Sequence, residues 1–162
     1  TTDAKPGIVT IGGPSVARGY RGEPDLTART FTAAGYRTSD LGQVGADGVL
    51  RILGRADDVV VVHGVNVSPL AVERVIGDLP DVSHVAVVAA PDVAGEPSLH
   101  AFVEVRDDGP DVSDPAIAAV VDHLGWAARP VMHRVDHLPH LPNGTVDRRL
   151  LQERATAGRE DS

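Results

Sequence analysis

Four consecutive valines, Val59 to Val62, restrict the backbone strongly, because branching at Cβ favours an extended strand over a helix. His63-Gly64 then predicts a tight turn, and residues 65–67 predict the returning strand. Ser68 followed by Pro69 is a typical helix start, with serine as the N-cap and proline at the first helical position. The apolar residues that follow recur at helical spacing: Leu70, Val72, Val75, Ile76 and Leu79.

The rest of the C-terminal segment alternates between strands and helices. Strands are expected at 82–90, 99–105 and 131–135, and helices at 113–124 and 147–154. Ser113 or Asp114 is the expected cap of the first of these two helices. Residues 57–155 therefore predict a small α+β domain with the order β-β-α-β-β-α-β-α.

Residues 1–56 predict strands and turns without a helical core. An apolar strand is expected at 8–11, a short helix capped near Asp25, and a strand pair around the Asp47-Gly48 turn. This segment is too short for a complete domain, so we interpret it as the β-rich end of a larger one. The polar residues 156–162 predict a frayed tail.

Composition excludes several classes of function. The formal charge of −8 argues against a nucleic-acid surface, which needs clustered lysine and arginine. The chain has no cysteine, which excludes disulfides and cysteine-based zinc sites. No run is apolar enough for a signal core or a membrane span, and a cytoplasmic protein is the simplest expectation. His133, His137 and His140 have no accompanying carboxylate pattern, so we predict no metal site there.

Two short blocks carry the strongest functional signal: Tyr36-Arg37-Thr38-Ser39-Asp40 and Gly54-Arg55-Ala56-Asp57-Asp58. Together they closely resemble the adenylate-forming ligases, which include acyl- and aryl-CoA synthetases, luciferases and the adenylation domains of nonribosomal peptide synthetases. The resemblance extends in order along nearly the whole chain. Further matching pieces are Gly13-Pro14-Ser15-Val16, Asn66-Val67-Ser68-Pro69, Ala90-Pro91-Asp92 and Val146-Asp147-Arg148.

The resemblance implies roles for four residues. Asp40 would bind the ribose hydroxyls of ATP or the acyl-adenylate, and Arg55 would support it. Asp57 would be the hinge about which a mobile C-terminal domain, residues 57–155, rotates. Gly64 would let the pantetheine arm of CoA pass close to the backbone. Three of the four have a plainer alternative: a turn-capping carboxylate for Asp40, a capping aspartate in a rigid linker for Asp57, and a hairpin glycine for Gly64.

Two features of the family are missing from this sequence. The phosphate loop rich in Ser, Thr and Gly does not occur, and Thr145 occupies the position of the lysine in the Gly-Lys-x-x-Arg pattern. That lysine would stabilise charge that moves between the substrate carboxylate and the α-phosphate. A threonine hydroxyl carries no net charge, so the resemblance predicts no catalytic residue at Thr145.

The sequence therefore predicts the C-terminal portion of an AMP-forming acid–CoA ligase that is inactive alone. The resemblance implies ATP or AMP and CoA in a complete enzyme, with Mg²⁺ arriving with ATP through the missing part. The implied partners are an N-terminal ligase domain, in trans or lost by truncation, and a thiol of CoA or of a carrier protein. Alternatives are a non-catalytic docking or regulatory module, a relic without function, and a fragment of a peptide synthetase adenylation domain.

Overall fold

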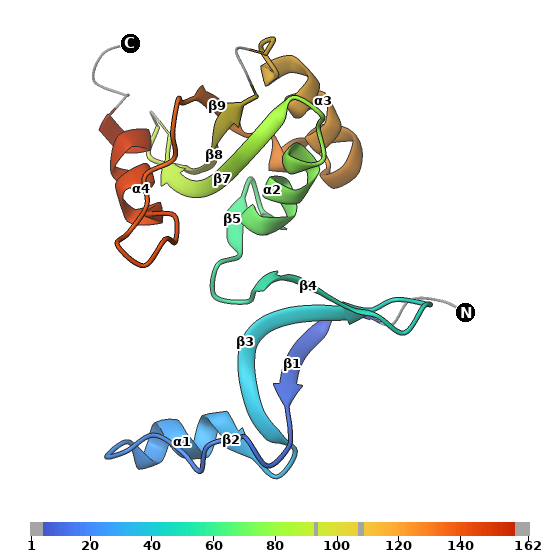
Figure 1. Cartoon of the computed structure of the whole chain (residues 1–162), viewed down its shortest axis with the longest axis vertical. Helices are drawn as coiled ribbons and strands as arrows, with labels where there is room; N and C mark the ends of the chain where they lie inside the picture. The colour runs from blue at the N-terminus through green and yellow to red at the C-terminus, as the bar shows by residue number, and fades with distance from the viewer. Residues whose placement is uncertain (1–4, 93, 107–108, 158–162) are drawn as a thin grey trace. The chain divides into compact units, whose positions relative to one another are not determined.

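The computed structural model describes residues 5–92, 94–106 and 109–157. The chain divides into two compact units, Thr1–Asp58 and Val59–Ser162. Both mix strands with helices, as the α+β prediction required (Figure 1). In the part of the chain that the structure describes, no helix is long and apolar enough to cross a membrane.

The first unit is a four-stranded antiparallel sheet with one short helix. The long central strand β3 pairs with β1, β2 and β4. Its elements are β1 (Gly7–Ile11), α1 (Pro24–Thr30), β2 (Phe31–Thr32), β3 (Gly35–Val44) and β4 (Leu50–Arg55). The short helix expected near Asp25 is present, with Glu23 at the N-cap position, Pro24 at its start and Asp25 in its first turn.

The second unit has a three-stranded sheet covered on both faces. Strand β8 lies in the centre, antiparallel to β7 and parallel to β9. The elements are β5 (Val60–Val62), β6 (Val65–Val67), α2 (Pro69–Gly77), β7 (Val82–Pro91), β8 (Pro97–Val105), α3 (Ser113–Leu124), the 3₁₀ turn η1 (Trp126–Ala128), β9 (Val131–Arg134) and α4 (Arg148–Ala157).

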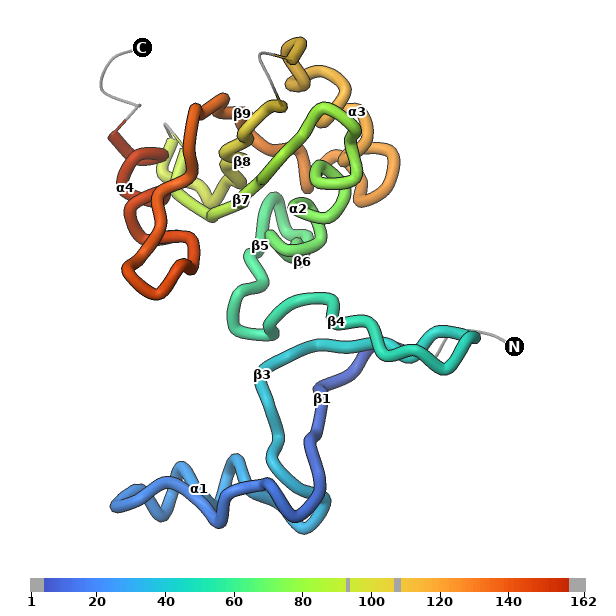
Figure 2. Tube along the Cα trace, viewed as in Figure 1, coloured from blue at the N-terminus to red at the C-terminus, as the bar shows by residue number. Residues whose placement is uncertain are grey.

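Alternation along the strands separates two apolar clusters. Val87 and Leu99 point toward α2 and α3, whereas Val88 and Phe102 point toward α4. Helices α2 and α3 therefore cover one face of the sheet and α4 the other (Figure 1). The β5–β6 hairpin packs on the α2 side, and the trace runs directly from this hairpin into α2 (Figure 2).

The observed helix ends agree with the sequence prediction for α2 and differ from it for α3 and α4. Ser68 caps α2 as predicted, and its side chain accepts a hydrogen bond from the Ala71 amide. For α3 the expected caps were wrong: Val112 is the N-cap, and the Asp111 carboxylate accepts from the Ser113 amide instead. Helix α4 continues to Ala157, because Ala155 is buried in its last turn. The frayed tail was predicted from Thr156, which was wrong for residues 156 and 157, since both are helical; residues 158–162 lie outside the described residues.

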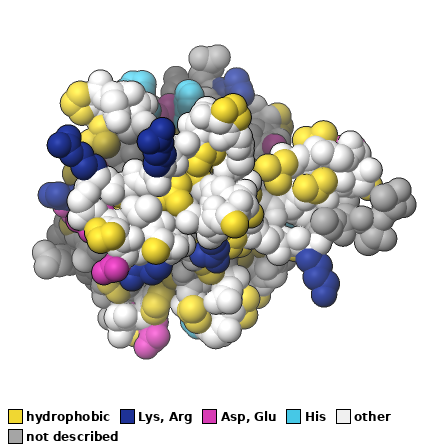
Figure 3. Space-filling view, turned by 90° about the horizontal axis from the view of Figure 1, so that it is seen from below, with side chains coloured by type: hydrophobic (Ala, Val, Ile, Leu, Met, Phe, Trp, Pro, Cys, Tyr) yellow, Lys and Arg dark blue, Asp and Glu magenta, His cyan; other side chains and the backbone are white. Residues whose placement is uncertain are grey.

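The two units differ in their cores. All buried apolar side chains among the described residues belong to the second unit, beginning with Val62. The first unit keeps apolar side chains such as Ile11, Val49 and Leu50 about half exposed. Hydrophobic side chains are spread over the surface seen in Figure 3, among lysine and arginine side chains.

We therefore expect hydrogen exchange to divide the chain near Asp58. Amides of β7, β8 and α2 should exchange slowest, because their opening requires disruption of the buried core. Amides of β1 and β3 should exchange much faster, since no such core holds that sheet. Mass spectrometry of peptic fragments measures both, and equal protection on the two sides of Asp58 would contradict this expectation.

Candidate functional site

Asp40 and Arg55 face each other across two paired strands. They are direct partners in the β3–β4 register, and Asp40 Oδ1 lies 4.0 Å from Arg55 Nη1. Buried Thr38 fixes the strand here: its hydroxyl accepts from the Asp40 amide at 3.0 Å and donates to the Val9 carbonyl at 2.9 Å. The Asp40 carboxylate is 38% exposed, so it retains acceptor capacity for a ligand.

Arg55 binds Asp57 more tightly than it binds Asp40. Its Nε and Nη2 donate to the two Asp57 oxygens at 3.1 and 2.8 Å, a bidentate pair. The Arg55 hydrogen bonds are the main reason that the pKa of Asp57 lies below its usual value. Asp58 is 4.0 Å from the same guanidinium. One arginine thus joins the predicted ribose ligand Asp40 to the predicted hinge residue Asp57.

Gly64 occupies the tip of the β5–β6 hairpin. Val62 pairs with Val65, which leaves a two-residue turn of His63 and Gly64, with φ of 49° and 79°. Positive φ at both positions matches the mirror-image turns that connect twisted strands. A Cβ added at Gly64 would meet nothing within 4 Å, so the backbone there is open to an approaching molecule.

Next to this hairpin lies Trp126, which the sequence analysis did not single out. It is 64% exposed, and its ring contacts that of His63 at a centroid distance of 5.8 Å. The two residues border a hollow of 460 Å³ that extends to β9. Trp126 is the only tryptophan of the chain, and an exposed tryptophan often marks a contact surface. The sequence shows the single tryptophan but not its exposure.

Thr145 lies in a tight loop before α4. Its hydroxyl donates to Asn143 Oδ1 at 2.7 Å, and its amide donates to the same oxygen at 3.1 Å. Its carbonyl accepts from the Leu141 amide, so both sides of the residue stabilise the loop. The Thr145 side chain therefore stabilises the turn by a hydrogen bond, and it carries no charge.

Both arginines after this loop form ion pairs with carboxylates. Arg148 Nη1 binds Glu73 Oε1 at 2.7 Å and the Val87 carbonyl at 2.9 Å, and Glu73 also accepts from the Val87 amide. Arg149 pairs with Glu153 on the exposed side of α4. The buried carboxylate of Glu73 therefore connects α2, β7 and the start of α4.

A chain of polar side chains crosses the α4 face of the sheet. Ser98 Oγ lies 2.9 Å from His100 Nε2, and His100 Nδ1 lies 2.9 Å from His133 Nε2. The two imidazole centroids are 5.2 Å apart and their planes nearly parallel. The distance between the two ring centroids exceeds the distance between the two bonded nitrogens by about one ring width, so the rings lie edge to edge. Phe102 stacks on His133.

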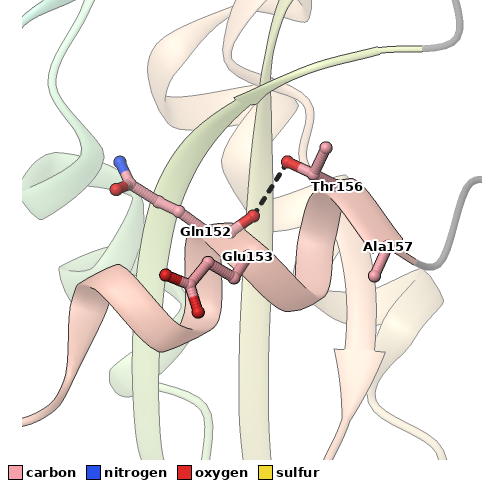
Figure 4. Close-up of a pocket in the computed structure, with 4 residues that line it drawn as sticks. All are labelled: Gln152, Glu153, Thr156 and Ala157. Atoms are coloured by element: carbon pink, nitrogen blue, oxygen red, sulfur yellow. Dashed lines mark hydrogen bonds between the residues drawn. The ribbon is translucent and has the colours of Figure 1, made fainter.

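No three metal-binding side chains converge in the part of the chain that the structure describes. His133 forms its hydrogen bond with buried His100, and His140 Nδ1 lies 2.8 Å from the Leu138 carbonyl. A shallow hollow on the outside of α4 is lined by Gln152, Glu153, Thr156 and Ala157 (Figure 4). Thr156 there donates to the Gln152 carbonyl, and Glu153 is paired with Arg149.

Acid should destabilise the second unit through His133. Burial lowers the pKa of His133, so the folded protein binds its proton less readily than the unfolded chain. This contribution to stability is present above a pH of about 6.5 and is lost as the pH falls below it. The urea midpoint should fall between pH 7.5 and 5.5, less in His133→Phe than in the parent. His137→Gln is the control, and an equal fall in both variants would contradict the assignment.

No family model matches the chain, but individual known proteins do. A probable non-canonical nonribosomal peptide synthetase of Salinispora arenicola is 46% identical over 112 residues, 64% of this chain and 1% of that protein. A medium/long-chain-fatty-acid–CoA ligase of Mycobacterium tuberculosis is 34% identical over 161 residues, 94% of this chain and 28% of that protein. The chain is homologous to a part of the adenylate-forming ligases.

Solved structures of this superfamily superpose on nearly the whole chain. An amide bond synthetase from Marinactinospora thermotolerans matches with a TM-score of 0.81 and 31% identity, over 93% of this chain and 31% of that one. An anthranilate CoA ligase in complex with anthranoyl-AMP matches with a TM-score of 0.77 and 26% identity, over 94% and 31%. This chain therefore corresponds to the C-terminal part of such ligases and spans less than a third of each relative.

Proposed function

We propose that this chain is the C-terminal portion of an AMP-forming acid–thiol ligase. The complete enzyme would join a carboxylic acid to ATP, release pyrophosphate, and pass the acyl group from AMP to a pantetheine thiol. Residues 1–56 would complete the adenylate-binding domain, and residues 57–155 would form the mobile domain. The observation that supports this most is the cluster in which Arg55 contacts both Asp40, the proposed ribose ligand, and Asp57 at the boundary between the two units.

Asp40 would accept hydrogen bonds from both ribose hydroxyls of the adenylate. Its exposure and its long distance to Arg55 leave its oxygens available for that purpose. Arg55 would orient Asp40 and hold Asp57 while the mobile domain rests. When the backbone rotates at Asp57, the two hydrogen bonds to Arg55 would have to break. The Arg55–Asp57 pair would therefore stabilise the domain orientation that exists before the rotation.

Gly64 and Thr145 would serve different half-reactions. The hairpin with Gly64 packs on the α2 side of the sheet, whereas the loop with Thr145 precedes α4, which covers the other side. The thiol arm would pass the open backbone of Gly64. Adenylation would lack the charge that a lysine at position 145 supplies, and this sequence has no phosphate loop. The chain alone would catalyse neither step.

A second candidate is a docking or regulatory module without catalysis. The loss of charge at Thr145 favours it, because the hydroxyl is engaged with Asn143 and both following arginines are paired with carboxylates. Such a module would keep the hairpin surface and would need no nucleotide contact at Asp40.

Grafting distinguishes the two candidates. The chain is joined behind the N-terminal part of a related CoA ligase, in place of that enzyme's own C-terminal part, and thioester formation is measured from presupplied acyl-AMP. We expect transfer to CoA, and Asp40→Ala should lower kcat/KM for acyl-AMP by about tenfold or more, since hydrogen bonds to a charged group are lost. Asp47→Ala removes another exposed carboxylate of the same unit and should change nothing. Equal rates in the two variants would favour the docking module.

A further inference from the structure

Ser39 of strand β3 contacts the two residues that directly follow strand β4. Its carbonyl accepts a hydrogen bond from the Ala56 amide at 2.7 Å, which continues the β3–β4 ladder by one step beyond its last paired residues. Its hydroxyl donates a hydrogen bond to the Asp57 carboxylate. Ser39 therefore holds the short segment that connects the sheet of the first unit to the unit boundary, which follows Asp58.

The Asp57 carboxylate is consequently held from two sides. Arg55 donates to both of its oxygens at 3.1 and 2.8 Å, and the Ser39 hydroxyl donates to it from the neighbouring strand. The guanidinium reaches Asp57 through a long side chain with several rotatable bonds, whereas the serine hydroxyl lies one bond from Cβ. Because a short side chain can follow a moving partner only slightly, Ser39 fixes the position of the carboxylate more narrowly than Arg55 does.

Other carboxylates compete with Asp57 for the arginine. Asp40 and Asp58 each lie 4.0 Å from the Arg55 guanidinium. One cation shared among three carboxylates binds each of them less firmly than it would bind one alone. A hydroxyl carries a single proton, and Ser39 donates it to Asp57. The serine contact is therefore specific to Asp57, whereas the arginine contact is shared.

The exposure of these groups makes the contacts reversible. The Asp57 side chain is 56% exposed and that of Arg55 is 50% exposed. Hydrogen bonds and ion pairs in such positions contribute little individually, because water replaces each lost partner. Several of them together hold one conformation of the segment, and they can all break without opening a buried core.

We propose that Ser39 is a positioning residue that sets the resting conformation of the segment around Asp57. Its hydroxyl keeps the Asp57 carboxylate on strand β3, and rotation at Asp57 begins when this hydrogen bond and the two from Arg55 break together. This rests on the proposed function, because only an enzyme with a rotating domain uses such a release. Without the hydroxyl, the segment leaves its resting conformation more often and the rotation begins sooner.

Nuclear magnetic resonance tests the contact on the whole chain, without catalysis. Ser39→Ala should raise the pKa of Asp57, read from its carboxyl carbon, by about 0.5, because a hydrogen bond to the charged form is lost. Backbone nitrogen relaxation should show larger motions at residues 56–58 in this variant. Ser39→Thr keeps the hydroxyl and should restore both measurements. Ser15→Ala removes an exposed hydroxyl elsewhere in the first unit and should change neither.

Catalysis is measured on the chain joined behind the N-terminal part of a related CoA ligase. With presupplied acyl-AMP, Ser39→Ala should raise kcat for thioester formation by about twofold to fivefold, because the rotation that precedes transfer begins sooner. KM for acyl-AMP should stay within about twofold, since Asp40 is retained. Ser39→Thr should transfer at the parental rate. A loss of fold in Ser39→Ala would instead lower kcat, so the direction of the change separates the two effects.

Different outcomes overturn different parts of the proposal. If Ser39→Ala leaves the pKa of Asp57 unchanged, or if Ser39→Thr does not reverse its effects, the hydroxyl does not hold Asp57. If both resonance effects appear while kcat stays at the parental value or falls, Ser39 positions the segment without controlling the rotation. Failure of the ligase function itself appears separately, as an Asp40→Ala graft that transfers at the parental rate.

Discussion

Thr145→Lys should raise the adenylation rate by about a hundredfold when the chain is joined behind the N-terminal part of a related ligase. The added ammonium group would stabilise charge on the reacting oxygens, an effect of roughly 3 kcal/mol. The substitution should keep the loop, because the backbone amide of residue 145 can still donate to Asn143. Thioester formation from presupplied acyl-AMP should stay within about twofold, since it depends on the hairpin of Gly64.

Pyrophosphate exchange measures the first half-reaction, and release of AMP in the presence of the thiol measures the second. Thr145→Val is the matched control, because it removes the hydroxyl without adding charge, and it should not raise adenylation. If the unmodified graft already adenylates at the rate of the related enzyme, or if Thr145→Lys alters neither half-reaction, the assigned position of the missing lysine is wrong.

Arg148→Ala should lower the free energy of unfolding by about 2–3 kcal/mol. The substitution leaves the buried carboxylate of Glu73 without its cation and the Val87 carbonyl without its donor. The adjacent Arg149→Ala is the matched control. Its pair with Glu153 is exposed, so its loss should cost no more than about 0.5 kcal/mol. Urea unfolding of both variants provides the comparison, and equal losses would mean that the Glu73 contact does not stabilise the second unit.

Local patterns predicted the elements that depend on near neighbours. The start of α2 at Ser68-Pro69 and the hairpin turn at His63-Gly64 follow from side-chain size and backbone preference within a few residues. The cap of α3 was missed, because Ser113 is the first helical residue and both its amide and its hydroxyl donate to the Asp111 carboxylate.

Contacts between distant residues could not be predicted in this way. Arg148 was recognised only as a piece of a resemblance, and its ion pair with Glu73 requires the sheet to bring α2 and α4 to the same residue of β7. The edge-to-edge pair of His100 and His133 likewise depends on the parallel register of β8 and β9. The roles of Asp40, Arg55, Asp57 and Gly64 stay predictions, although the first three do lie together.

The side chains that bind the Val87 backbone also occupy hydrogen-bonding groups at the β7 edge of the three-stranded sheet. Strand β7 is an outer strand, and such strands expose unpaired amides and carbonyls to which another chain can add. Here the Glu73 carboxylate accepts a hydrogen bond from the Val87 amide, and Arg148 donates one to the Val87 carbonyl. Gln152 donates one to the Ala89 carbonyl. An incoming strand would find these positions occupied, so the pair that links two helices also protects this edge from aggregation.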